Sequence, residues 1–545
     1  AKIARGKYVL FLNNDTIVTE NWLSPIIKTL ENEKLNCGAV GSKLIFTNGI
    51  LQEAGSKIFI DGSTKGYGRF ENPDDPEYNY LREVDYCSGA CFLIKKELFD
   101  KVGGFDVSYF AYYEDVDLCM ELKKNGYKIF YNPDSIVFHY ENATSGLEEA
   151  IKSYKKNRIK FFEKWKDLLK KSYGINAKIK KILYLDDRIP SLTSGSGYSR
   201  AYLIVRLLKE LGYDLTIFPL QDQTRYQTAK ELQQLGIEVF YGNLDFERFS
   251  FNRKDFYDII IISRPHNLDK SFKICKKFFK SSIIIYDAEA LYSLREIIKD
   301  RIYGKNISDK EAENLISKEI NLAKEADIII TVSENEKKEF IKRDFNNVFI
   351  LGYGTEVKKS NNNFEKRKDI LFIGGNIVPG SPNEDAILFF IKEIFPLIKK
   401  ELDCKLYIVG DSKSEEIDNI ASNYQDSIII AGHVNNLTEF YDSCKLFIIS
   451  SRFSSGIPIK LYDAMANGIP CVISKLTAEQ MNFEDENLCL IGKDKKDFAK
   501  KIIKLYNDKK LWIKLRENSS EFIKNKSIEK MESDLNKVLD FAMKK

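Results

Sequence analysis

The residues whose types and spacing suggest chemistry are concentrated between Phe447 and Ser474, in the segment FIISSRFSSGIPIKLYDAMANGIPCVIS. Two short apolar runs have the length of buried parallel strands, and the stretch between them has helical composition and ends at Gly468. The segment therefore predicts a strand, a turn, a helix and a second strand. The turn contains Ser455 and Gly456, whose small size lets a ligand approach the backbone, and the following helix presents free N–H groups to an anion.

Three charged side chains accompany this turn. Lys460 and Arg452 flank the start of the helix, and Asp463 follows about one turn later. We favour a ligand that carries phosphate groups, because two cations and a helix start would surround the anion. In the structural alternative, Lys460 and Asp463 form an exposed pair three residues apart and Arg452 is a solvated surface charge.

The elements that must position this site repeat one pattern. Apolar strand-like runs alternate with helical patterns from 179 to 362 and again from 363 to 545, where the first strand ends at Gly374 and Gly375. Such alternation is typical of doubly wound parallel sheets, and the polar stretch at 358–366 separates the two halves. We expect two Rossmann-like lobes with a cleft for a nucleotide. In the first lobe, after an initial strand at 181–185, the expected strands are 214–218, 238–241, 258–263, 282–286, 327–332 and 347–351.

The first lobe has its own candidate residues. The loop DDRIPSLTSGSGYSR, which contains Gly197, lies between a strand and a helix, a phosphate-cradling arrangement that we assign to the donor side. It lacks both the GxGxxG fingerprint and the acidic residue that holds a ribose, which disfavours a nicotinamide enzyme. Asp287 ends a later strand and Arg295 follows eight residues on. The alternative is that Asp287 caps a helix and Arg295 solvates it.

Polar groups also lie at expected strand ends in residues 1–150. Asp15 follows a strand-like run, where it could hold a divalent cation or cap the next helix. Asp115 belongs to an acidic group at a helix start, which also suits the helix dipole. His139 is one of three histidines, and a single histidine is more often packed or capping than a ligand. The stretch 84–94 reads as a strand interrupted by Ser-Gly-Ala.

Composition limits the class of protein. The 545 residues are too many for one core, and 84 basic against 80 acidic residues leave a formal net charge of +4, which does not indicate a nucleic-acid partner. Nine cysteines without disulfide or metal-ligand spacing favour a reducing, cytoplasmic compartment. The longest apolar runs have strand length, and we find neither a signal peptide nor a transmembrane helix.

Residues 151–178 are expected to form an amphipathic helix and a linker. From 152 to 181, 12 Lys and Arg residues stand against two acids, so the polar face is strongly basic. We favour a closing helix packed on the front domain. The alternative is peripheral association with the inner face of an anionic membrane.

Three motifs characterise the front part: GKYVLFLNNDT, CSGACFLIKKELFDKVGGFD and YYEDVDLCMELKKNGYKIFY. With them, residues 1 to about 165 resemble the second half of a family 2, GT-A-type glycosyltransferase of the rhamnosyltransferase-like kind. The resemblance implies that Asp15 and His139 touch a divalent metal, Mn or Mg, bound to the nucleotide sugar. It also implies that Asp115 is the general base and that Gly89 lies in an acceptor-side segment.

Two departures from that family pattern affect the front part. Asn13 replaces the first acid of the metal-binding DxD motif and is a weaker metal ligand. The chain begins at Ala1 rather than Met, and the half that holds the nucleotide base in this family does not precede it. We therefore expect a truncated front module without activity of its own.

Five motifs characterise the rear part: SRPHN, YDAEALYSLRE, ADIIITVSENE, ILFIGGNIVPGSPNEDA and RFSSGIPIKLYDAMANGIPCV. With them, residues from about 179 to 530 resemble a family 4, GT-B-type glycosyltransferase. The resemblance implies that Lys460 and Arg452 neutralise the donor diphosphate and that Asp463 holds the ribose hydroxyls. The donor side would also include Ser455, Gly456 and the glycine pair 374–375.

The same resemblance assigns Asp287 and Arg295 to the acceptor side and requires no metal. One departure concerns the paired-glutamate motif of the family. Ser455 stands where the carboxylate that often grips the donor sugar is expected, and Asp463 replaces the second glutamate. The identity of the sugar is therefore left open.

The sequence predicts an α/β chain in which a truncated GT-A-type domain precedes a GT-B fold of two Rossmann-like lobes. The resemblance implies hexosyl or deoxyhexosyl transfer from a nucleotide sugar to a glycan or lipid-linked acceptor in surface-glycan or other polysaccharide biosynthesis, with the retaining rear module as the active part. Two alternatives remain: a nucleotide-sugar hydrolase or epimerase, and a nucleotide-sugar or glycan-binding scaffold without turnover.

Overall fold

The structure is a computed structural model that describes residues 1, 3–109, 111–140, 147–174, 180–192, 196–221, 226–242, 244–358, 360, 362–434 and 436–545. The chain divides into two compact units, which we describe separately. The first unit comprises 1–180, 212–218 and 222–243, and the second comprises 181–211, 219–221 and 244–545.

The first unit is built on a mostly antiparallel sheet. Its strands run in the order β1-β8-β3-β9-β2, with β4 paired to β3 and β7 to β9. Among the described strands of this sheet, only β3 and β9 pair in parallel. The central strand β3 is buried along its whole length. The strands are β1 (Tyr8–Leu12), β2 (Thr16–Val18), β3 (Cys37–Ile45), β4 (Leu51–Glu53), β5 (Ser56–Ile58), β6 (Thr64–Gly66), β7 (Arg82–Val84), β8 (Cys91–Lys95) and β9 (Lys128–His139).

The interrupted strand expected at 84–94 is in fact two strands with different partners. β7 pairs with β9, whereas β8 pairs with β1 and β3, and residues between them form no strand. Ser88 and Gly89 use their N–H groups to bind carboxylates instead of a ladder, which explains the break.

The helices of the first unit are α1 (Leu23–Glu31), α2 (Lys96–Lys101), α3 (Glu114–Lys124), α4 (Leu147–Gly174) and α6 (Tyr226–Gln234), with short 3-10 turns at Glu33–Leu35 and Pro76–Tyr78. β11 (Asp214–Pro219) and β12 (Glu238–Val239) form a parallel pair. Helix α4 packs Phe161, Trp165 and Leu169 into the core of the unit. The Trp165 indole N–H donates a 2.7 Å hydrogen bond to Asp117.

The packing of α4 bears on the membrane alternative. Its buried aromatic side chains are part of the protein core and are therefore not available for insertion into lipid. Among the described residues, no helix has both the length and the apolar character to span a bilayer.

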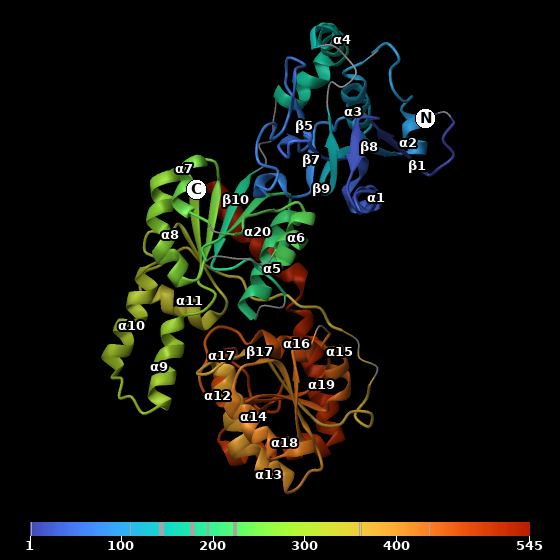
Figure 1. Cartoon of the computed structure of the whole chain (residues 1–545). Helices are drawn as coiled ribbons and strands as arrows, with labels where there is room; N and C mark the ends of the chain where they lie inside the picture. Colours follow the sequence, from blue (N-terminus) through green and yellow to red (C-terminus); the bar gives the residue numbers. More distant parts are fainter. Residues whose placement is uncertain are drawn as a thin grey trace. The chain divides into compact units, whose positions relative to one another are not determined.

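The second unit contains two parallel sheets (Figure 1). In the first lobe, five strands follow the order β10-β13-β14-β15-β16 and all neighbouring pairs are parallel. They are β10 (Lys181–Asp186), β13 (Ile259–Ser263), β14 (Ile283–Asp287), β15 (Ile328–Thr331) and β16 (Val348–Ile350), close to the expected bounds. Its helices are α5 (Ser196–Glu210), α7 (Phe246–Asn252), α8 (Pro265–Phe278), α9 (Tyr292–Ile302), α10 (Asp309–Asn321) and α11 (Glu334–Ile341).

The second lobe has a six-stranded sheet in the order β19-β18-β17-β20-β21-β22. The strands are β17 (Ile370–Ile377), β18 (Leu406–Ser412), β19 (Ile428–Gly432), β20 (Leu446–Ile449), β21 (Cys471–Ser474) and β22 (Leu490–Gly492). The helices are α12 (Pro382–Phe389), α13 (Phe395–Lys399), α14 (Glu415–Ser422), α15 (Thr438–Ser443), α16 (Ile459–Ala466), α17 (Lys475–Met481), α18 (Lys495–Asn507) and α19 (Lys509–Lys524), with a π-helical turn at Phe390–Ile394 and a 3-10 turn at Gln425–Ser427. The last helix, α20 (Ile528–Lys544), contacts the first lobe, where Phe541 packs on Phe349 of β16.

The strand order of the second lobe locates its ligand edge. The chain leaves β17 toward β18 on one side and returns on the other side as β20, so the order reverses between β17 and β20. In open parallel sheets, ligands bind outside the carboxyl ends of strands at such a reversal. The expected α/β class with Rossmann-like lobes is confirmed.

Candidate active site

The carboxyl end of β17 brings backbone close to the site. Gly374 lies in this strand, where the register with β18 shifts. A Cβ atom on Gly374 would lie 3.0 Å from Ile377 Cγ1 and 3.3 Å from Asn383, and one on Gly410 would overlap the Gly374 carbonyl oxygen. Glycine is therefore required for the close packing here, and the neighbouring Gly375 is exposed.

The turn after β20 has the shape that the sequence predicts. Gly456 has a φ of +74°, in the left-handed region that favours glycine. The Gln480 side chain of α17 fixes the turn, because it donates to the Ser454 carbonyl at 2.7 Å and accepts from the Ser454 hydroxyl at 3.0 Å. Ser455 and Gly456 then lead toward α16, at whose start the Ile459 N–H donates to the Ile457 carbonyl at 3.0 Å and the Leu461 N–H to the Pro458 carbonyl at 2.8 Å.

Lys460 is a partly buried cation without a described counter-ion. Its ammonium donates a 3.0 Å hydrogen bond to the Asn383 side-chain oxygen and lies 4.9 Å from the centre of the Phe372 ring. Burial lowers its pKa to about 8, and no described carboxylate forms an ion pair with it. A desolvated cation of this kind favours an anionic ligand.

Arg452 lies at the same edge, but its charge is compensated. Its Nε donates to Asp385 at 2.9 Å, and Nη2 forms a second, shorter hydrogen bond to the same carboxylate. The Tyr303 hydroxyl also donates to Asp385, at 2.7 Å. The hydrogen bonds to Asp385 raise the pKa of Arg452. Its role at a diphosphate stays a prediction, and Asp385 was not singled out from the sequence.

Asp463 lies one turn along α16 from Lys460. Burial raises its pKa to about 6, although Lys358 opposes the shift. The Tyr353 hydroxyl is 3.5 Å from its carboxylate, at the limit of a hydrogen bond. The carboxylate thus keeps acceptor capacity for a ligand hydroxyl, and no ion pair with Lys460 forms, contrary to the structural alternative. Its contact with a ribose stays a prediction.

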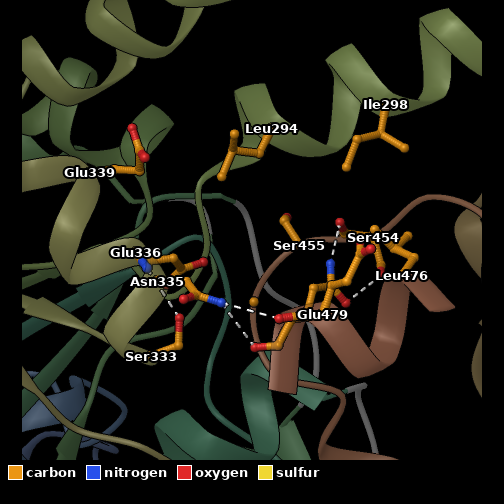
Figure 2. A pocket seen from close by; sticks show the side chains of 12 residues that line it. Leu294, Ile298, Ser333, Asn335, Glu336, Glu339, Ser454, Ser455, Leu476 and Glu479 are labelled. Carbon is orange, nitrogen blue, oxygen red and sulfur yellow. Dashed lines mark hydrogen bonds between the residues drawn. The ribbon is translucent and has the colours of Figure 1, made fainter. Parts of the chain in front are cut away.

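A cavity of about 240 Å³ lies beside the turn, and Figure 2 shows the side chains around it. Its lining comes from α9, α11 with its cap, the turn and α17: Leu294, Ile298, Ser333, Asn335, Glu336, Glu339, Ser454, Ser455, Gly456, Leu476, Glu479 and Gln480. The Asn335 amide donates to the Glu479 carbonyl at 3.3 Å. Sequence reasoning did not anticipate the α11 and α17 contributions, because they come from segments about 140 residues apart.

The two residues assigned to the acceptor side have separate partners. Asp287 is fully buried at the end of β14 and forms a 2.7 Å ion pair with Arg200. Arg295 lies on α9, pairs with its neighbour Glu296 at 3.2 Å and lies over the Tyr292 ring. Their acceptor roles remain predictions.

A charged cluster in the first lobe was not identified from the sequence. Arg264, at the end of β13, forms ion pairs of 2.8 to 3.0 Å with Asp186, Asp187 and Glu289 from the ends of β10 and β14. A Cβ on Gly197 would lie 1.7 Å from the Glu289 carboxylate, so Gly197 packs against this cluster. The signal was present in the sequence, since each charge ends a strand-like run.

Arg264 and Glu289 also have unusual backbone. Their φ angles are +76° and +56°, which is costly for residues other than glycine and is found mainly at functional sites.

In the first unit, the predicted metal residues lie together. The register of β2 with β9 pairs Thr16 with His139, which places His139 Nε2 3.3 Å from Asp15. Asn13 contacts the same nitrogen at 3.3 Å, and Gln52 contacts Nδ1. These residues supply two ordinary metal ligands. No group of three or more His, Cys, Asp or Glu side chains in the described part of the chain is arranged for a metal.

Asp115 is held at a strained helix start. Tyr112 and Tyr113 precede α3 with φ angles of +67° and +78°, and the Asn157 amide of α4 donates to the Tyr112 carbonyl at 2.9 Å. The Asp115 carboxylate accepts the Gly89 N–H at 2.8 Å, which brings two predicted site residues together. Burial raises the pKa of Asp115.

Two further acids near Asp115 were not singled out from the sequence. Burial raises the pKa of Glu53 to about 7, and Glu53 accepts the Ser88 N–H at 3.1 Å. Burial and then the Asp115 charge raise the pKa of Glu114 to about 7. Carboxyl groups with such pKa values are suited to proton transfer near neutral pH.

Comparison with known proteins identifies two kinds of segment. Residues 367–508 match the family model of glycosyl transferases group 1, residues 1–103 that of glycosyl transferase family 2, and residues 71–158 that of glycosyltransferase-like family 2. The chain thus contains glycosyltransferase segments of both kinds, as the two resemblances implied.

Two relatives are similar to part of the chain. The O-antigen biosynthesis protein RfbC of Myxococcus xanthus is 30% identical over 151 residues, 26% of this chain and 12% of RfbC. The rhamnosyltransferase WbbL of Escherichia coli K12 is 26% identical over 177 residues, 31% of this chain and 67% of WbbL. The chain therefore spans a small share of the length of RfbC.

A solved structure shares the fold of a large part of the chain. HepE of Anabaena, crystallised in complex with UDP-glucose, superposes with a TM-score of 0.51 at 15% identity, over 66% of this chain and 99% of HepE. A likeness at this identity shows the fold, which is of GT-B type.

Proposed function

We propose that the chain is a glycosyltransferase that moves a sugar from a nucleotide-sugar donor to a glycan or lipid-linked acceptor in the biosynthesis of a surface polysaccharide. The single observation that carries the proposal is Lys460, a cation without a described counter-ion at the start of α16, on the ligand edge of a doubly wound sheet. The family matches and the relatives' names support sugar transfer. HepE supports a nucleotide sugar as donor.

The proposed division of labour follows the predicted domains. Residues 1–150 are the GT-A-like part, 151–178 the basic helix and linker, 179–362 the acceptor lobe and 363–545 the donor lobe. The donor lobe performs retaining transfer without a metal. A cytoplasmic position at the inner membrane face fits nine buried, unbridged cysteines and a lipid-linked acceptor.

The chemistry assigned to the donor lobe is stabilisation of a leaving diphosphate. The bond between the anomeric carbon and the diphosphate oxygen breaks, a bond from that carbon to the acceptor oxygen forms, and the acceptor hydroxyl gives its proton to the departing diphosphate. Negative charge grows on the diphosphate, where the Lys460 ammonium stabilises it. Gly374 allows the backbone to approach, and Asp463 accepts hydrogen bonds from the ribose hydroxyls.

The front part is assigned a base rather than a complete metal site. Asp115 lies at the acceptor-side Gly89, and its raised pKa suits a proton acceptor. A divalent metal would neutralise a donor diphosphate at Asp15 and His139. Because the described residues supply two ligands there, we derive no step through a metal.

One observation favours a second candidate, a nucleotide-sugar or glycan-binding scaffold without turnover. Arg452 is already paired with Asp385, so the positive charge of one of the two side chains predicted to bind the diphosphate is already balanced. Such a protein would bind nucleotides but release no product.

The test begins with a thermal-stability screen of the full chain with UDP, GDP and dTDP. The nucleotide that stabilises the protein is then supplied as its nucleotide sugars, and the products are analysed. We expect one nucleotide to raise the melting temperature and its sugar to be transferred only when an acceptor is present. Stabilisation without product would support the scaffold, and sugar release without acceptor would support a hydrolase. The absence of any stabilisation would contradict nucleotide binding altogether.

A further inference from the structure

The first turn of α12 contacts both cations of the candidate donor site. Asn383 accepts the hydrogen bond of Lys460 at 3.0 Å, and Asp385, two residues later, binds Arg452 through both carboxylate oxygens. The turn itself is anchored, because the Ser381 hydroxyl caps the N–H of Glu384 at 3.2 Å. Two cations from another segment are thus held by one short, fixed element.

The two contacts differ in charge. The Asn383 oxygen is neutral, so it orients the Lys460 ammonium without cancelling its charge. No other described group cancels that charge, because the Phe372 ring is the other contact, Asp463 lies near Tyr353 and Lys358, and Asp385 is engaged by Arg452. Lys460 therefore offers its full charge to a ligand.

The contact with Asp385 instead fixes the orientation of the Arg452 guanidinium. The Asp385 side chain is only 3% exposed, whereas that of Arg452 is 35% exposed. Two parallel N–H···O contacts leave a planar guanidinium little rotational freedom. The Phe389 ring lies 5.2 Å from the guanidinium carbon, and the Tyr303 hydroxyl holds the carboxylate from a second side. The N–H groups of Arg452 that do not bind Asp385 are therefore held in a fixed orientation.

We propose that Asn383 and Asp385 are the positioning residues of the donor site: Asn383 aims Lys460 with its charge intact, and Asp385 fixes the guanidinium of Arg452. The proposal rests on the proposed function for the nature of the anion, a diphosphate. Its evidence is the hydrogen bonding of α12, which is independent of that function.

The first test measures the Lys460 ammonium directly, by NMR titration of the full chain labelled at the lysine ε-carbons, with Lys460→Arg used to assign the signal. The Asn383→Asp variant should raise the pKa of Lys460 from about 8 into the ordinary range of lysine or above, because a carboxylate replaces a neutral oxygen. The Asn383→Leu variant should lower it below 8. Glu384→Gln is the control, since Glu384 lies on the same turn but binds the Gly380 N–H.

An unchanged Lys460 titration in both Asn383 variants would overturn its positioning role. Sugar-transfer activity does not enter this measurement, so the result stands apart from the proposed function. If the wild-type protein binds no nucleotide but the titration shifts as stated, the proposed function fails while the positioning role remains.

The second test measures binding of inorganic pyrophosphate, which carries the diphosphate without a base. Asp385→Asn should weaken pyrophosphate binding about tenfold, because Arg452 loses its fixed orientation, and Asp385→Glu should restore part of the affinity. Asp403→Asn, at a 96% exposed acid of the same lobe, is the matched control. Equal or tighter binding by Asp385→Asn would show that Asp385 only opposes the Arg452 charge and would overturn its positioning role.

Discussion

Replacing Lys460 with methionine should separate catalysis from stability. Removing one preorganised group that stabilises the leaving diphosphate should lower kcat ~10²-fold or more, about 3 kcal/mol of transition-state stabilisation. The same change removes a desolvated cation whose described polar contact is one amide oxygen, and methionine has a similar length and no charge. The melting temperature should therefore stay equal or rise, because an uncompensated buried charge costs folding free energy.

The pKa of Lys460 also predicts how the stability difference between the wild type and Lys460→Met changes with pH. The pKa of Lys460 falls from 10.5 in the unfolded chain to about 8 in the folded protein. Below pH 8 both states carry the proton, so the full penalty of the buried charge is present. Between pH 8 and 10.5 the unfolded state binds more protons, and stability rises with pH. The stability advantage of Lys460→Met should therefore shrink across this window.

The assay combines initial rates of sugar transfer with thermal melts at pH 7 and pH 10. Lys495→Met is the matched control, because this lysine is half exposed and pairs with Glu393 on the surface. Near-normal kcat in a well-folded Lys460→Met protein would refute the role of this cation. A large loss of stability would refute the argument that its charge is uncompensated.

Three further changes test other parts of the account. Asp463→Asn should weaken binding of the nucleotide about tenfold with a smaller effect on kcat, since ribose contacts are alike in ground and transition states. An unchanged affinity, measured by calorimetry, would show that Asp463 does not contact the nucleotide. Transfer by the rear part should persist in EDTA, because its anion site consists of Lys, Arg and backbone N–H groups; complete loss that manganese restores would identify the front part as the active one. Gly197→Ala should lower the free energy of unfolding by ~1–3 kcal/mol, because its Cβ would lie 1.7 Å from the Glu289 carboxylate. A melting temperature equal to that of the wild type would contradict this, because it would show that the carboxylate can move away from the new methyl group.

The parallel sheets could be predicted because their strands are continuous apolar runs. β13 has four isoleucines among its five residues and β14 has three, and a strand buried on both faces needs no alternation. The break expected at Ser-Gly-Ala within 84–94 is present, and its N–H groups bind Glu53 and Asp115. The different partners of the two strands on either side of it could not be predicted, because strand pairing depends on residues distant in sequence.

The site was predictable where its residues are close in sequence. The turn at Ser455, the cation Lys460 and the acid Asp463 are eight residues or fewer apart, so helix geometry alone relates them. Asn383 and Asp385 lie nearly 80 residues before Lys460, and no local pattern connects them with it. Their role became visible only through the side-by-side placement of β17 and β20.

The Arg264 cluster required the strand order as well. Its members follow the ends of three strands, and Asp186 and Glu289 are 103 residues apart in sequence, so the order β10-β13-β14 is needed to bring those ends together. The charged residues themselves were visible in the sequence, yet each one alone was indistinguishable from a helix cap.

The central claim is most directly tested by the transfer of radiolabelled sugar from a nucleotide sugar to a lipid-linked or glycan acceptor, measured for the full chain and for Lys460→Met. The account predicts incorporation by the wild-type protein that depends on the acceptor and falls at least ~10²-fold in the variant. Equal incorporation by the two proteins, or none by a wild-type protein that binds the nucleotide, would contradict it.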